Sequence, residues 1–201
     1  MAKAIQRSHD QTIRHAAGQT QQATVNRILR VWHSASDGQK EEGAQWYPLH
    51  RALLVQLSRD YVVTEEHVAA VIAHMSPRVQ WAPCLLQSAN VLAGRPTSGI
   101  MGRSVQGAQR ALQTDDPLST LTGPKVSAFA ANLLGDLDAV TVDVWAMRVA
   151  FGERDDLDAI LKKRGVYDAV SHCYRLAARR VGVHPSTMQA ATWVALRGRS
   201  S

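Results

Sequence analysis

Apolar residues recur at helical spacing along most of this chain, and this periodicity restricts the fold more than any other feature of the sequence. Val25, Ile28 and Leu29 fall on one face of a predicted helix. Thr64 is a typical N-cap residue before a second such stretch, EEHVAAVIAHM, whose two leading acids suit the helix dipole. Only residues 139–144 alternate as a strand would, and they lead directly into another helical pattern. The sequence therefore predicts an all-α fold.

The ends of this pattern set the predicted domain boundaries. Residues 1–18 are polar and aperiodic, so we expect a flexible tail there. Residues 19–201 contain no internal repeat and no linker, and we expect them to form a single domain, a bundle of two helical lobes that share one core. Within this domain Pro48 is predicted to begin a helix, because proline is tolerated in the first turn.

The chain is basic, with a formal net charge of +6 and a pI of about 9.7. Such a charge favours a polyanionic partner, because each phosphate contact releases counterions. No apolar run reaches the ~20 residues needed to cross a membrane. The amino terminus also lacks the apolar stretch of a secretory signal. We therefore expect a cytoplasmic protein without a membrane partner.

The two cysteines, Cys84 and Cys173, are far apart and belong to no CxxC pair. Their spacing excludes a zinc ribbon and a four-cysteine iron–sulfur cluster made by one chain, and it favours two buried thiols. The sequence also lacks a phosphate-binding glycine loop and the ligand spacing of a zinc deaminase. No metal or other cofactor is expected.

The stretch that says most about function is DPLSTLTGPKVSAF, residues 116–129. A short helix, a tight turn and a second helix that starts near Pro124 form a predicted hairpin between two helices. At such a turn the backbone N–H groups of Gly123, Lys125 and Val126 point outward without an intrahelical partner. A DNA phosphate is a natural ligand for these groups.

Two residues in and after this hairpin are candidates for catalysis. Lys125 lies in the first turn of the second predicted helix, where the dipole disfavours a cation. The same field favours the neutral amine, which is the form that attacks carbon. Asp143 follows 18 residues later in an apolar context. It is either the N-cap of the next helix or a buried functional carboxylate, and the sequence leaves both alternatives open.

These residues resemble the helix-hairpin-helix DNA glycosylases, endonuclease III in particular. That family carries a leucine-proline-glycine-valine-glycine-x-lysine turn, then a valine-aspartate pair, then an arginine five residues after the acid. In this sequence Gly123, Lys125, Val142, Asp143 and Arg148 fall in those places. The resemblance implies a helix-hairpin-helix motif that binds DNA.

Two further segments extend the resemblance to roughly residues 64–199. The run TWVALRGR is similar to a tryptophan-x-x-leucine-x-glycine-arginine run of the family through Trp193, Leu196, Gly198 and Arg199. Upstream, Ser76 and Arg78 stand where the family has its wedge loop. The resemblance implies that these two residues approach the opened duplex.

The sequence departs from the family at several positions. Leu121 replaces the first glycine of the turn, Pro124 removes one N–H donor, and Trp145 stands where many members have histidine. The cluster cysteines of endonuclease III are absent. These features resemble a divergent phage branch of the superfamily, whose members are associated with installing groups on 5-hydroxymethyluracil. For a phage-encoded protein the expected location is the cytoplasm of the bacterial host.

The resemblance implies a DNA glycosylase and abasic-site lyase that acts on double-stranded DNA as a monomer. A target pyrimidine, expected to be a modified one, is flipped out of the duplex, Lys125 attacks the sugar C1′, and Asp143 stabilises the positive charge that develops there. The expected DNA contacts are Gly123 and Val126 through their backbone, Ser76, Arg78 and Arg148 from the resemblance, and Arg103, whose charge suits the DNA backbone. The alternative on the same fold is a transferase that hypermodifies thymine through 5-hydroxymethyluracil.

A transcription regulator is the alternative from another class. Residues 174–198 resemble a helix-turn-helix, with Gly182 in the turn and Pro185 at the start of the second helix. A recognition helix must offer polar side chains to the groove, whereas Trp193 and its neighbours are predicted to be buried. An exposed Trp193 on a basic face would favour the regulator. A third alternative is a glycosylase-like protein that binds DNA without catalysis.

Overall fold

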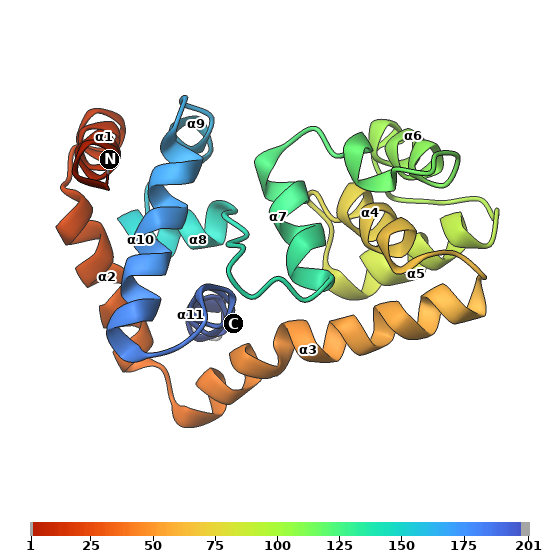
Figure 1. Cartoon of the computed structure of the whole chain (residues 1–201), viewed down its shortest axis with the longest axis horizontal. Helices are drawn as coiled ribbons and strands as arrows, with labels where there is room; N and C mark the ends of the chain where they lie inside the picture. Colours follow the sequence, from red (N-terminus) through yellow and green to blue (C-terminus); the bar gives the residue numbers. More distant parts are fainter. Residues whose placement is uncertain (1, 198–201) are drawn as a thin grey trace. The chain divides into compact units, whose positions relative to one another are not determined.

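The computed structural model describes the backbone of residues 2–197 and the side chains of residues 9–197. Over this range it contains eleven α-helices and one short 3₁₀-helix, and no strand (Figure 1). The predicted all-α class is confirmed. The chain divides into two compact units: unit 1 comprises Met1–Trp46 and Leu137–Ser201, and unit 2 comprises Tyr47–Asp136.

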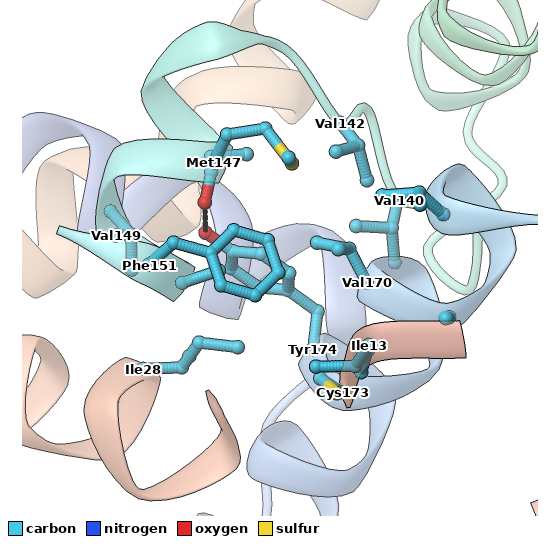
Figure 2. Packing of buried hydrophobic residues seen from close by; sticks show 14 of the residues in the cluster. Ile13, Ile28, Val140, Val142, Met147, Val149, Phe151, Val170, Cys173 and Tyr174 are labelled. Carbon is cyan, nitrogen blue, oxygen red and sulfur yellow. Dashed lines mark hydrogen bonds between the residues drawn. The ribbon is translucent and has the colours of Figure 1, made fainter. Parts of the chain in front are cut away.

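Unit 1 is a helical bundle with α10 and α11 at its centre. Its helices are α1 (Ala2–Ala17), α2 (Gln21–Ser34), the first part of α3 (Asp37–Asp60), α8 (Val144–Phe151), α9 (Leu157–Leu161), α10 (Val166–Val181) and α11 (Pro185–Arg197). α10 packs against α1, α2 and α11, while α2 and α8 both contact α11. Ile28, Met147 and Tyr174 are among the largest buried side chains of its core (Figure 2).

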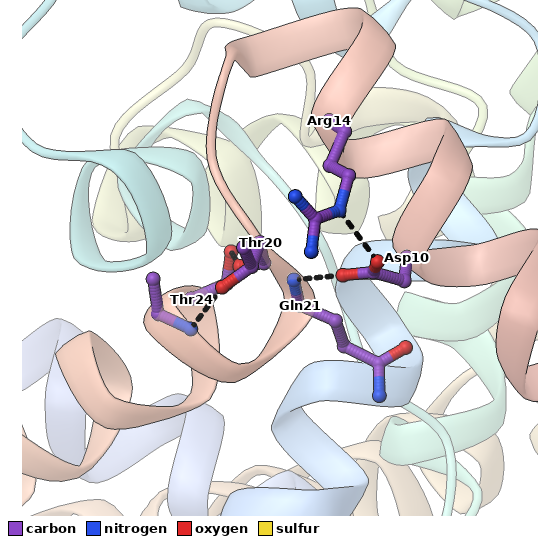
Figure 3. Close-up of polar contacts among 6 residues, drawn as sticks. Asp10, Arg14, Thr20, Gln21 and Thr24 are labelled. Atoms are coloured by element: carbon purple, nitrogen blue, oxygen red, sulfur yellow. Dashed lines mark hydrogen bonds and ion pairs between the residues drawn. The ribbon is translucent and has the colours of Figure 1, made fainter.

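Helix α1 occupies most of the segment 1–18, where the sequence predicts a flexible tail, so the structure differs from that prediction. Ile13 is fully buried, and the helix packs against α2 and α10. Asp10 also ties α1 to α2: its carboxylate accepts the Gln21 N–H at 2.8 Å and pairs with Arg14 at 2.6 Å (Figure 3). The apolar stripe of α1 is narrow, and the many polar residues around it hide its period.

Helix α3 begins earlier than its predicted start at Pro48. It starts at Asp37, after a capping box in which Ser36 Oγ accepts the Gln39 N–H and Gln39 Oε1 accepts the Ser36 N–H. Pro48 therefore lies inside the helix, next to the point where α3 passes from unit 1 to unit 2. An interior proline costs a helix about 3 kcal/mol. The predicted start was wrong because the upstream capping box decides where this helix begins.

Unit 2 is built around α4 (Glu65–Met75). Its other elements are the second part of α3, α5 (Trp81–Leu92), α6 (Gly102–Ala111), η1 (Pro117–Thr120) and α7 (Pro124–Leu133). Residues 68–73 of α4 are each at most 1% exposed, because α5, α6, η1 and α7 all pack against this helix. Thr64 caps α4 as predicted, since its hydroxyl accepts the His67 N–H at 3.2 Å. α4 thereby supports η1, the turn after it and α7.

Candidate functional site

The predicted order of short helix, turn and second helix is present in unit 2. η1 is a 3₁₀-helix of four residues, and α7 begins at Pro124 as expected. Gly123 takes the N-cap position and, as a glycine, has no side chain that could accept a hydrogen bond from the first turn. The N-cap residue therefore leaves the N–H groups of Lys125 and Val126 without a side-chain acceptor. This is the condition under which a helix start can bind an anion.

His74 holds this turn from α4. Its Nε2 lies 2.9 Å from Thr120 Oγ1, and the Thr120 hydroxyl donates to the Pro117 carbonyl at 2.6 Å. Because a hydroxyl has only one proton, His74 Nε2 must be the donor in the first bond. The other ring nitrogen faces α6 so closely that a Cβ on Gly107 would lie 2.4 Å from it. Burial lowers the pKa of His74, and the positive charge of Arg110 acts in the same direction.

Lys125 is half-buried in the first turn of α7 and lies close to Cys84 of α5. Burial raises the pKa of the Cys84 thiol to about 11, although the hydrogen bond with Ser88 and the charge of Lys125 both act to lower it. Cys84 is therefore a neutral thiol near pH 7 and a poor nucleophile. Among the described residues Lys125 takes part in no ion pair. Within the described part of the chain, no ion pair thus offsets the unfavourable position of this cation in the helix dipole.

The loop after α4 carries the predicted DNA contacts Ser76 and Arg78. Ser76 ends the helix, and its hydroxyl donates to the Ala73 carbonyl at 3.0 Å. Arg78 is exposed and has a φ of +63°, in the left-handed region that few residues other than glycine adopt. Such backbone strain costs about 1–3 kcal/mol and is concentrated at functional sites. Arg103, in the first turn of α6, is exposed as well.

In unit 1, Asp143 is the N-cap of α8. Its Oδ1 accepts the Ala146 N–H at 2.9 Å, and the residue is half-buried. Of the two alternatives that the sequence leaves open, the cap is therefore confirmed. A catalytic role for the carboxylate stays a prediction. Val142, directly before it, is completely buried, so the segment that leads to Asp143 is fixed in the core.

Two tyrosines of α10 lie near Asp143, and no local pattern in the sequence points to them. The Tyr167 hydroxyl bonds to the backbone on both sides of Thr141, at 2.8 and 3.2 Å. Tyr174 is completely buried and donates to the Ala146 carbonyl at 3.1 Å. Burial raises the pKa of Tyr167 to about 12, and the negative charge of Asp143 acts in the same direction. The pKa of Tyr174 is raised for the same two reasons, so both phenols are neutral.

Arg148, the predicted DNA contact of unit 1, makes two contacts within the protein. Its guanidinium lies over the Trp145 ring, 4.5 Å from the centroid, and its Nε is 3.4 Å from the Glu153 carboxylate. The side chains of Arg148 and Glu153 are 32% and 74% exposed. An ion pair this exposed contributes less than about 1 kcal/mol. The Arg148 Nε is itself buried and makes no hydrogen bond among the described residues. DNA contact by Arg148 stays a prediction.

The burial of α11 argues against the regulator, which would use this helix for recognition. Arg197 is the one exposed residue of α11, whereas Met188 and Ala191 are fully buried. Trp193 is half-buried, with its ring edge-on to Trp46 at a centroid distance of 6.1 Å. A recognition helix needs a free polar face for the major groove, and α11 has none.

Close packing against α3 fixes the position of α11. A Cβ on Gly43 would lie 2.3 Å from the Cα of Ala191, so the two helices meet backbone to backbone. Leu196, near the end of α11, is half-buried. Gly198 and Arg199, which also carry the resemblance to the glycosylases, lie outside the described residues.

Fold and candidate residues together define an all-helical protein of two compact units. The chain belongs to a family of unknown function, DUF7178, whose model matches residues 10–200. No curated protein and no solved structure matches it. None of the described helices is long and apolar enough to cross a membrane. Within the described part of the chain, no group of three or more His, Cys, Asp or Glu residues is arranged to hold a metal ion.

Proposed function

We propose that this protein is an enzyme that processes bases in double-stranded DNA, with Lys125 as nucleophile and Asp143 as the carboxylate that stabilises charge on the sugar. The observation that carries the proposal is the placement of Lys125. It is half-buried in the first turn of α7, after an N-cap without a side chain, and no ion pair of the described residues includes it. The dipole opposes a cation there. A nucleophilic amine explains the position, and helix stability does not.

In the proposed reaction a modified pyrimidine nucleotide is flipped out of the duplex. The neutral Lys125 amine attacks C1′: the Nζ–C1′ bond forms, the bond from C1′ to the base nitrogen breaks, and its electron pair leaves with the base. The proton lost from the amine passes to the departing base. Asp143 stabilises the positive charge on the sugar while these bonds exchange. Opening of the sugar ring gives a Schiff base, and elimination of the 3′ phosphate then breaks the strand.

The proposed partner is duplex DNA, bound by a monomer. The net charge of +6 supports this partner, as do the exposed Arg78 and Arg103, whose charges suit phosphates. The start of α7, which has no side-chain cap, suits one phosphate as well. In this proposal η1, the turn and α7 form the helix-hairpin-helix motif of a two-lobed, glycosylase-like fold. The same residues serve the alternative, a transferase acting on 5-hydroxymethyluracil.

Borohydride trapping tests the proposal. The full-length protein is mixed with duplexes that carry an abasic site, uracil, 5-hydroxymethyluracil or phosphorylated 5-hydroxymethyluracil, and the covalent adduct is measured after reduction. We expect the wild-type protein to form an adduct and, where the duplex carries a target base, to release that base. Lys125→Arg keeps a cation for DNA binding and forms no Schiff base. Lys162→Ala is the control, because Lys162 is an exposed lysine of unit 1 that pairs with Asp158, and it should be trapped as the wild type is.

The outcomes separate the alternatives. No adduct with any duplex contradicts a glycosylase or lyase that uses a lysine nucleophile. Binding to the 5-substituted duplexes without an adduct favours the transferase. Sequence-specific binding to unmodified DNA without an adduct favours a regulator. An adduct that persists in Lys125→Arg contradicts the assignment of the nucleophile.

A further inference from the structure

Residues 140–142, directly before Asp143, are buried and belong to no helix or strand. Val140 and Val142 come after α7 and before α8 in the sequence, and both are at most 1% exposed. The described residues contain no strand that could pair with them. Buried backbone N–H and C=O groups need hydrogen-bond partners, and the loss of one destabilises a fold. A side chain from another helix provides partners here.

That side chain is Tyr167, in the first turn of α10. Its hydroxyl donates to the Val140 carbonyl at 2.8 Å and accepts the Val142 N–H at 3.2 Å. One oxygen thus binds the backbone on both sides of Thr141, in the way that a neighbouring strand would. Val170, one turn further along α10, is fully buried and anchors the helix in the core of unit 1.

Asp143 is consequently held through both its backbone and its side chain. Its backbone continues directly from Val142, whose N–H is bound by Tyr167. Its Oδ1 accepts the Ala146 N–H at 2.9 Å at the start of α8. Burial raises the pKa of Tyr167 to about 12, so the phenol keeps the proton that it donates to Val140.

We propose that Tyr167 is a positioning residue, whose hydroxyl holds residues 140–142 so that the Asp143 carboxylate is aimed at the sugar of the bound nucleotide. The inference rests on the proposed function of Asp143 and deepens it. Tyr167 acts through Asp143 and does not touch the substrate. Tyr167→Phe is the direct test, because it keeps the ring and removes only the oxygen that two backbone groups share.

Tyr174→Phe is the matched control. Tyr174 lies on the same helix, two turns further on, and its hydroxyl also donates to a backbone carbonyl, that of Ala146, at 3.1 Å. Ala146 also donates its N–H to Asp143, but the carbonyl that Tyr174 binds lies within α8 and not in the segment that leads to Asp143. Both substitutions are expected to lower the free energy of unfolding. Only Tyr167→Phe is expected to move the carboxylate.

The first measurement is the single-turnover rate of adduct formation on the four duplexes used for trapping. Tyr167→Phe is expected to lower the maximal rate about tenfold to a hundredfold, because a small displacement of a catalytic group has effects of that size. The DNA concentration that gives half the maximal rate should not change. Tyr174→Phe should react at close to the wild-type rate. Equal losses in the two variants, or no loss in Tyr167→Phe, would overturn the proposal.

The second measurement reports on the position of the segment before Asp143 and does not depend on enzymatic activity. NMR follows hydrogen exchange of the Val142 amide and the chemical shift of the Ala146 amide proton, which Asp143 binds. Tyr167→Phe is expected to speed the exchange and move the shift, whereas Tyr174→Phe should leave Val142 protected. If neither signal responds in Tyr167→Phe, the positioning role is wrong even when the wild type traps DNA. If both respond and the wild type traps no duplex, the proposed function fails and the hold of Tyr167 on Asp143 stands.

Discussion

The two candidate catalytic residues both lie at the start of a helix, but the two helices begin in opposite ways. α8 follows its N-cap residue Asp143, which accepts the Ala146 N–H and places a carboxylate where the dipole favours one. α7 begins with Pro124 after an N-cap glycine that offers no side chain, and its first turn carries Lys125. The carboxylate stabilises the helix that it begins, whereas the lysine opposes the dipole of its helix.

This difference shows which residue needs a function to explain it. Asp143 has a complete structural role as a cap, so its position would be understood in a protein without catalysis. Lys125 has no such role among the contacts that the structure describes. The comparison therefore predicts similar effects of the two residues on reactivity and opposite effects on stability.

The largest expected effect is on adduct formation. Lys125→Gln removes the nucleophile, and Asp143→Asn keeps an oxygen for the cap but removes the charge. Each should lower the single-turnover trapping rate by at least about a hundredfold, the usual size for the loss of such a group. Circular dichroism should show both variants folded. If Asp143→Asn reacts at the wild-type rate, Asp143 is a cap and nothing more.

The next effect in size is on the stability of α8. Asp143→Ala removes the cap and should lower the free energy of unfolding in urea by about 1 kcal/mol. Asp143→Asn should restore most of it, because an amide oxygen can also accept the Ala146 N–H. Thr64→Ala, which removes the corresponding cap of α4, is the control and should show a loss of similar size. If Asp143→Ala leaves the free energy of unfolding unchanged, the cap does not stabilise α8 in solution.

What could be predicted from the sequence depended on how far apart the interacting residues lie. The cap at Thr64 and the start of α7 at Pro124 were predicted correctly, because their signals span a few residues. The bonds of Tyr167 to residues 142 and 140 span 25 and 27 residues, and that of His74 to Thr120 spans 46. Such pairs leave no local pattern, and only the packing of helices brings them together.

The two corrections have a different cause. The capping box of Ser36 and Gln39 is a local signal that marks the start of α3, whereas Pro48 is a start signal that the helix overrides. The stripe of α1 depends on few apolar residues such as Ile13, which are buried only because α10 lies beside them. The weak apolar periodicity of α1 therefore indicates a buried helix only once its packing partner is known, and the sequence does not identify that partner.

A pH effect on stability should distinguish the two units. The folded-state pKa of His74 is lowered from 6.5, mainly by burial, so the unfolded chain takes up a proton first as the pH falls. The contribution of the neutral ring to stability is fully present above about pH 6.5 and is lost as the pH falls toward the folded-state pKa, with a slope of at most about 1.4 kcal/mol per pH unit. Amide exchange in unit 2 should therefore speed up in mild acid, and His74→Gln should reduce that change.

His172 gives the matched test in unit 1. Burial is the largest of the causes that lower the pKa of His172, and His9, Arg179 and Arg175 act in the same direction. The His9 and His172 rings lie 4.5 Å apart. His172→Gln should reduce the pH dependence of exchange in unit 1 and leave that of unit 2 unchanged. If His74→Gln and His172→Gln each alter both units equally, the units unfold as one and the assignment of each histidine to its own unit is wrong.

The smallest expected effect bears most directly on the comparison between α7 and α8. Lys125→Gln should raise the free energy of unfolding by about 0.3–1 kcal/mol at low salt, because it removes a cation from the first turn of a helix. Lys162→Gln, which breaks an exposed ion pair with Asp158, should lower it by about 0.3–0.5 kcal/mol. Both changes should shrink in high salt as the charges are screened. If Lys125→Gln instead destabilises the protein at low salt, the Lys125 amine has a structural partner. Its position would then be explained by stability, as that of Asp143 is, and the main argument for Lys125 as the nucleophile would be lost.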